Sequence, residues 1–146
     1  MALDFNKFAQ EGNTFINKLS ENLGHTSQED RGQVTRILKA VMHTLRDSLE
    51  FHENLHVISQ LPMALKAVWV DQWEYKEKPH RPRSIEEFED IVKSYQRLYG
   101  EQNFDWGKGT DQIVRITIES LKEYITLGEA IHVMGQLPKE VQELMG

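Results

Sequence analysis

The second half of this chain repeats the pattern of the first half 76 residues later. Gln60-Leu61-Pro62 recurs as Gln136-Leu137-Pro138, and apolar positions keep the same register. The aligned apolar pairs are Ile37/Ile113, Leu38/Val114, Met42/Ile118, Leu45/Leu121 and Leu49/Ile125. Self-similarity at a fixed spacing is typical of duplicated structural units that bury their apolar faces against each other. We interpret residues 3–69 and 84–146 as two repeats within one domain spanning residues 1–146, joined by a linker at 70–83.

Apolar residues in both halves recur every three to four positions, which is the spacing of one helix face. No segment alternates at period two, as a half-buried strand would. Capping boxes begin at Thr26 and Ser84, and Gly24 provides a helix stop. We therefore predict an all-α fold of about eight helices, in two pseudo-twofold-related four-helix repeats that share one core. The expected helices cover about 5–23, 26–49, 52–60, 62–69, 84–99, 109–126, 128–135 and 138–144.

Composition excludes several classes of protein. A chain of 146 residues suits a single domain, and its formal net charge of −6 opposes a mainly electrostatic grip on nucleic acid. The chain has no cysteine, so it can form neither a disulfide nor a thiolate metal site. We see neither a signal peptide nor a membrane-spanning stretch, and expect a cytoplasmic protein that does not interact with membranes.

Several spaced elements together resemble one known family. They are the segment from Leu38 to Leu49, Gln60-Leu61-Pro62-Met63, Trp73, Lys78-Pro79 and Glu87-Phe88. This arrangement resembles the bacterial domain-of-unknown-function family 2267. The resemblance implies an all-helical fold and no particular activity. The chain departs from the family pattern at Gln72, where glycine is usual, and at Ser48, where arginine is usual.

His52-Glu53-Asn54-Leu55-His56 matches the zinc-peptidase pattern, in which both histidines ligate zinc and the glutamate activates water. The repeat argues against this interpretation, because His52 corresponds to Gly128 in the second half. We therefore expect the match to be incidental and predict no catalytic residues.

The duplicated feature is Glu-x-x-His, present as Glu53/His56 and Glu129/His132. Ferritin-like di-metal proteins use two such pairs and one further glutamate from each of two other helices. Glu11 and Glu87 could supply that second pair of carboxylates, because they occupy matching positions in the two repeats. The alternative is structural, since Glu87 and Glu129 each stand three residues after a helix-capping hydroxyl. We favour this alternative and expect neither a metal nor a cofactor.

The linker region combines aromatic and basic residues. The candidate partner surface consists of Trp69, Trp73, Tyr75, Arg81 and Arg83. Such residues can stack on a ligand or contact a partner, although packing beneath the linker also explains them. His43 and Asp47 lie one turn apart on an expected helix, where we predict a surface pair. The sequence thus favours a non-enzymatic helical protein that binds a ligand, a protein partner or a second copy of itself. Metal binding is the alternative.

Overall fold

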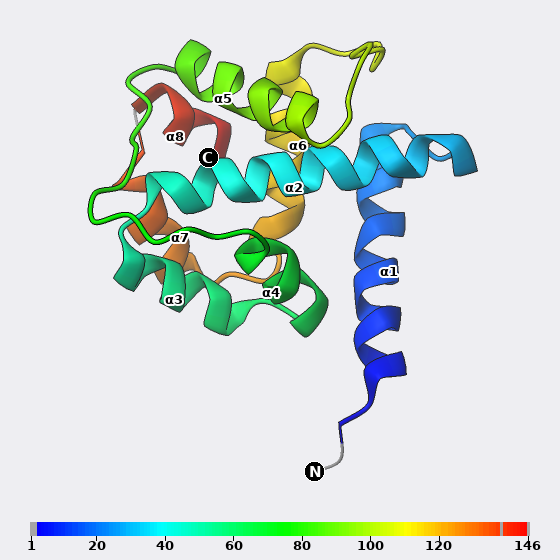
Figure 1. Cartoon of the computed structure of the whole chain (residues 1–146), viewed down its shortest axis with the longest axis horizontal. Helices are drawn as coiled ribbons and strands as arrows, with labels where there is room; N and C mark the ends of the chain where they lie inside the picture. Colours follow the sequence, from blue (N-terminus) through cyan, green and yellow to red (C-terminus); the bar gives the residue numbers. More distant parts are fainter. Residues whose placement is uncertain (1–2, 138, 146) are drawn as a thin grey trace.

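The computed structural model describes residues 3–137 and 139–145, and all the regular secondary structure within that range is helical (Figure 1). The helices are α1 (Phe5–Leu23), the 3-10 turn η1 (Gln28–Asp30), α2 (Arg31–Ser48), α3 (Phe51–Gln60), α4 (Met63–Val70), α5 (Ile85–Leu98), α6 (Thr110–Lys122), α7 (Leu127–Met134) and α8 (Lys139–Met145). The predicted all-α fold is confirmed. The predicted helix start at Pro138 lies outside the described residues. None of the described helices combines the length and the apolar character needed to cross a membrane.

Local sequence signals account for several of the helix ends. Asp4 caps α1 by accepting a hydrogen bond from the Lys7 backbone N–H, and Gly24 ends it with φ +71°. The expected helix start at Thr26 is wrong by several residues. Ser27 is the cap, and its hydroxyl accepts from the Asp30 N–H, so the chain first forms the tighter turn η1 and only then α2.

Helix α2 lies at the centre of the molecule. It crosses the middle of the structure between α5 on one side and α3 and α4 on the other, whereas α1 lies at the edge of the molecule and packs against α2, α4 and α6 (Figure 1). Its apolar stripe is buried and consists of Val34, Ile37, Leu38, Val41 and Leu45. These side chains join buried residues of α5, α6, α7 and α8 in one hydrophobic cluster. Burial of this surface is the main stabilising contribution to the fold.

The linker between α4 and α5 begins with a left-handed turn at Gln72, whose φ is +59°. The left-handed backbone conformation costs an L-residue about 1–2 kcal/mol, whereas glycine adopts it without this cost. The position is the one at which the resembling family usually carries glycine.

We predict that Gln72→Gly stabilises the protein by about 0.5–1 kcal/mol, because relief of the left-handed strain exceeds the extra entropy of the unfolded chain. Urea unfolding measures this difference. Gln102→Gly is the control, since Gln102 is exposed in a loop without positive φ and should lose stability. Equal effects of both changes would contradict the prediction.

Candidate metal centre

Helices α3 and α7 pack against each other and bring the two Glu-x-x-His pairs together. Glu53 and Glu129 are only 5% and 7% exposed, so two carboxylates are buried at this contact. His56 and His132 stand at its edge, with side chains 49% and 68% exposed. We call these four residues the α3–α7 cluster. The structure thus brings together four of the six candidate metal ligands predicted from sequence.

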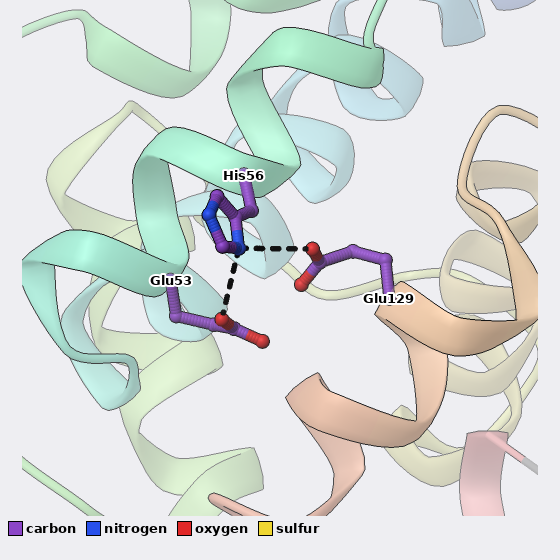
Figure 2. Close-up of side chains that lie close together, drawn as sticks. All are labelled: Glu53, His56 and Glu129. Carbon is purple, nitrogen blue, oxygen red and sulfur yellow. Dashed lines mark ion pairs between the residues drawn. The ribbon is translucent and has the colours of Figure 1, made fainter.

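The side chains of three of these residues converge on one point (Figure 2). His56 Nδ1 lies 3.6 Å from Glu53 Oε2 and 3.6 Å from Glu129 Oε1. Ligand atoms of Glu53, His56 and Glu129 all lie within 4.8 Å of one another. His132 Nδ1 lies 3.8 Å from the other oxygen of this carboxylate, Glu53 Oε1. The Glu53 carboxylate therefore lies between two imidazoles.

The cluster is electrostatically unfavourable for its two carboxylates. Glu53 Oε1 and Glu129 Oε2 are buried and have no hydrogen-bond partner among the described residues. Burial raises the pKa of Glu129 to about 7, and the neighbouring Glu53 carboxyl adds to the increase. Buried acceptors without partners cost about 1–3 kcal/mol each, so this arrangement favours any cation that occupies it.

Helix capping does not explain the two carboxylates. The Thr126 hydroxyl accepts from the Glu129 N–H, as the capping box predicts. However, the Thr126 N–H donates to Gln60 Oε1 at 2.7 Å rather than to Glu129. On the other helix, the Glu50 N–H donates to Gln136 Oε1 at 3.0 Å. The glutamines of the two Gln-Leu-Pro segments thus satisfy these helix starts, and both glutamate side chains turn toward each other.

The other sequence candidates lie elsewhere. Glu11 is on α1, and Glu87 accepts a hydrogen bond from the Arg83 backbone N–H at the start of α5. The only group of three or more potential metal ligands within the described chain contains neither of them. The His52 ring packs edge-on against the His56 ring, with their centroids 4.5 Å apart, but His52 does not belong to that group. The zinc-peptidase arrangement, with His52 and His56 as ligands and Glu53 free, is not the one observed.

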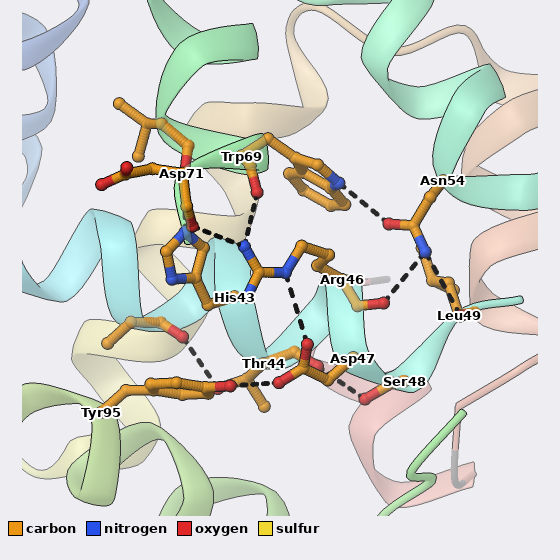
Figure 3. A network of polar contacts seen from close by, with 12 residues as sticks. His43, Thr44, Arg46, Asp47, Ser48, Leu49, Asn54, Trp69, Asp71 and Tyr95 are labelled. Atoms are coloured by element: carbon orange, nitrogen blue, oxygen red, sulfur yellow. Dashed lines mark hydrogen bonds and ion pairs between the residues drawn. The ribbon is translucent and has the colours of Figure 1, made fainter. Parts of the chain in front are cut away.

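Sequence reasoning missed a buried polar network at the C-terminal half of α2 (Figure 3). His43 is fully buried rather than on the surface, so the predicted surface pair with Asp47 is wrong. Its Nε2 donates to the Val68 carbonyl at 2.7 Å, and its Nδ1 accepts from the Tyr99 hydroxyl at 2.5 Å. Asp47 instead accepts from the Tyr95 hydroxyl. The helical spacing gave no signal of this network, because His43, Arg46 and Asp47 lie off the apolar stripe of α2.

Arg46 is the charged centre of this network and is only 4% exposed. Its Nη1 donates to the Trp69 and Asp71 carbonyls at 2.9 Å each, and its Nε contacts Asp47 at 3.3 Å. Asn54 links α3 to the same region by accepting from the Trp69 indole N–H at 2.9 Å. These contacts fix α3 relative to α2 and α4, and so hold one half of the α3–α7 cluster in place.

The predicted partner surface is only partly exposed. Trp69 is 2% exposed because its indole turns inward toward α3, so its assignment to that surface is wrong. Trp73 is partly buried, whereas Tyr75, Arg81 and Arg83 are exposed. Arg81 pairs with Glu50 at 3.3 Å.

The family resemblance is confirmed by a family model described as an uncharacterised conserved protein, DUF2267, which matches residues 12–144. No curated protein matches the chain.

We predict that Glu129→Gln stabilises the metal-free protein by about 1–3 kcal/mol, because it removes one of two facing buried carboxylates. Urea unfolding at pH 8 with a chelator measures the change. Glu119→Gln, on the exposed surface of α6, makes the same change in net charge and should have little effect. Destabilisation of the Glu129 variant would show that the carboxylate is a structural anchor.

We also predict that His43 destabilises the fold at acid pH. Burial lowers its pKa to about 4, and the nearby Arg46 and Lys39 charges contribute. The unfolded chain binds this proton near pH 6.5, so the stabilising contribution is complete above pH 6.5 and is lost as pH falls toward 4. The loss amounts to about 3 kcal/mol.

Urea unfolding of the wild type and of His43→Gln between pH 4 and 7 isolates this contribution as the difference between two stability curves. The variant should show a flatter dependence on pH, whereas the exposed His80→Gln should retain the wild-type slope. Parallel curves for wild type and His43→Gln would contradict the prediction.

Proposed function

The chain therefore belongs to the DUF2267 family of uncharacterised conserved proteins, and we propose from the geometry of the α3–α7 cluster that it binds one divalent metal ion. The ligands are Glu53, His56 and Glu129, with His132 beside them as a fourth donor. The observation that carries the proposal is the convergence of an imidazole on two buried carboxylates whose remaining oxygens lack hydrogen-bond partners among the described residues.

The spacing of these ligand atoms suits an ion. In a four-coordinate site with bonds of about 2.0–2.2 Å, neighbouring ligand atoms lie about 3.3–3.6 Å apart. His56 Nδ1 stands 3.6 Å from an oxygen of each glutamate. These separations are too long for hydrogen bonds and are close to the edges of such a coordination polyhedron. A cation could be coordinated with only small side-chain shifts.

The donor set indicates which ions fit. When both carboxyl groups are ionised they carry a charge of −2, which a divalent ion neutralises, and the imidazole donates a nitrogen. Mixed oxygen and imidazole ligands suit zinc, manganese and iron(II), whereas copper(I) prefers sulfur ligands. The chain has no cysteine that could compete for such an ion. We propose zinc, manganese or iron(II) as the bound ion.

We further propose that the two halves of the chain are duplicated copies related by a pseudo-twofold axis through this site. Matching contacts support this: Gln60 accepts from the Thr126 N–H, and Gln136, 76 residues after Gln60, accepts from the Glu50 N–H. Glu53 and Glu129 are separated by the same 76 residues and face each other. In this proposal, duplication itself created the paired carboxylates.

The proposal concerns binding and includes no catalytic step, in keeping with the non-enzymatic, cytoplasmic protein expected from sequence. A protein partner or a second copy remains part of that expectation. This proposal adopts the alternative of the sequence analysis, metal binding through the Glu-x-x-His pairs, in place of the favoured expectation that no metal is bound.

We expect untagged protein, purified from cells supplied with iron, manganese and zinc, to contain about one of these ions per chain by mass spectrometry. Isothermal titration of the stripped protein should give the same stoichiometry. His56→Ala should weaken binding at least tenfold, because it removes the ligand that faces both carboxylates.

The control variant is His80→Ala, which removes an exposed imidazole outside the cluster and should bind normally. His52→Ala should also bind normally, because His52 does not belong to the ligand group. Folded wild-type protein that binds none of the three ions, or a His56→Ala variant with unchanged affinity, would refute the proposal.

A further inference from the structure

A second candidate site lies away from the α3–α7 cluster, beneath the linker that joins α4 to α5. The linker crosses α2 before it turns toward α5 (Figure 1). It borders a cavity of about 310 Å³ that is open to solvent on one side and whose lining includes Phe51, Trp73, Tyr75, Lys76 and Lys78. A volume near 300 Å³ is at the lower end of the range for small-molecule sites.

The floor of the cavity is already hydrogen-bonded. Arg46 and Asp47 line it, but Arg46 donates to Trp69, Asp71 and Asp47, and Asp47 also accepts from Tyr95 (Figure 3). Because the charges of Arg46 and Asp47 neutralise each other, the floor of the cavity presents no net charge to a ligand. Selectivity must therefore come from the walls.

One wall is aromatic. Phe51 lies 5.5 Å from Trp73 at 31° and 5.6 Å from Tyr75 at 89°, measured between ring centroids. Phe51 and Tyr75 remain 49% and 70% exposed. Aromatic rings with free faces offer stacking contacts to a planar ligand.

The rim is basic in an otherwise acidic protein. Lys76 and Lys78 line the cavity, and neither has a hydrogen-bond or ion-pair partner within residues 3–137 and 139–145. Glu74 is the one lining carboxylate besides the neutralised Asp47. The chain as a whole carries a net charge of −6. Two unpaired ammonium groups beside an aromatic wall complement a planar ring that bears an acidic group.

Hydrogen bonds hold the linker at both ends of this cavity, in a local turn where it leaves α4 and by a contact with α2 near its end. The Trp73 N–H donates to the Val70 carbonyl at 3.1 Å, and the His80 N–H donates to the Asp47 carbonyl at 2.8 Å. Arg81 pairs with Glu50 just beyond the second attachment. The cavity is therefore preformed, which lowers the entropic cost of binding.

We propose that this cavity binds a small planar aromatic anion, such as an aryl carboxylate. The ring stacks against Phe51, Trp73 and Tyr75, and the carboxylate faces Lys76 and Lys78. The proposal is independent of metal binding at the α3–α7 cluster.

Three probes that share one ring system test it: indole-3-acetate, neutral indole and cationic tryptamine. Each is titrated into nitrogen-15-labelled full-length protein at low salt, and the three tryptophan indole N–H signals are followed by NMR. Trp73→Phe identifies the Trp73 signal. We expect indole-3-acetate to shift that signal with an affinity at least fivefold higher than that of tryptamine. The Trp106 signal, from a side chain stacked on His25 outside the cavity, should not move.

The charge variants complete the test. Lys76→Gln/Lys78→Gln should abolish the preference for the anion, whereas Lys7→Gln/Lys139→Gln makes the same change in net charge at exposed positions outside the cavity and should preserve it. Equal or tighter binding of tryptamine would overturn the assigned charge preference. An unmoved Trp73 signal at millimolar indole-3-acetate would overturn the site itself.

Discussion

The buried guanidinium of Arg46 is the interaction on which the arrangement around α2 depends. A charge that is 4% exposed must find partners inside the protein, because its desolvation otherwise costs several kcal/mol. Its partners are the carbonyls of Trp69 and Asp71 at the end of α4 and the carboxylate of Asp47. Arg46 thus determines where α4 ends and where the linker leaves it. The position of the linker in turn determines the cavity beneath it.

The contact between α3 and α7 follows a different principle. Two facing carboxylates with unsatisfied buried oxygens weaken this interface in the absence of a counter-charge. The backbone N–H groups at the starts of α3 and α7 donate to Gln136 and Gln60. The glutamates therefore have no capping role that would explain their burial. An interface that loses stability through its central residues is typical of a binding site, where strain in the empty protein is relieved by the ligand.

Helix α3 contributes to both sites. Glu53 and His56 face α7, whereas Phe51 and Asn54 line the cavity below the linker. A ten-residue helix can serve two sites because side chains at successive positions point in different directions around its axis. Asn54 also receives the Trp69 indole hydrogen bond, which fixes the rotation of α3 about that axis. One hydrogen bond within the core therefore orients residues of both proposed sites.

Sequence by itself determined the helices, because apolar spacing and capping residues act over a few neighbouring positions. It predicted eight helices close to the observed positions, and it marked Glu53, His56, Glu129 and His132 through their repetition. Only the tertiary structure decided what these residues contact. It placed Glu53 against Glu129 and buried His43 and Trp69, and it left Glu11 and Glu87 apart. Helix propensity is local, whereas the burial of a charge depends on which distant helix packs over it, and that information is not contained in any single segment.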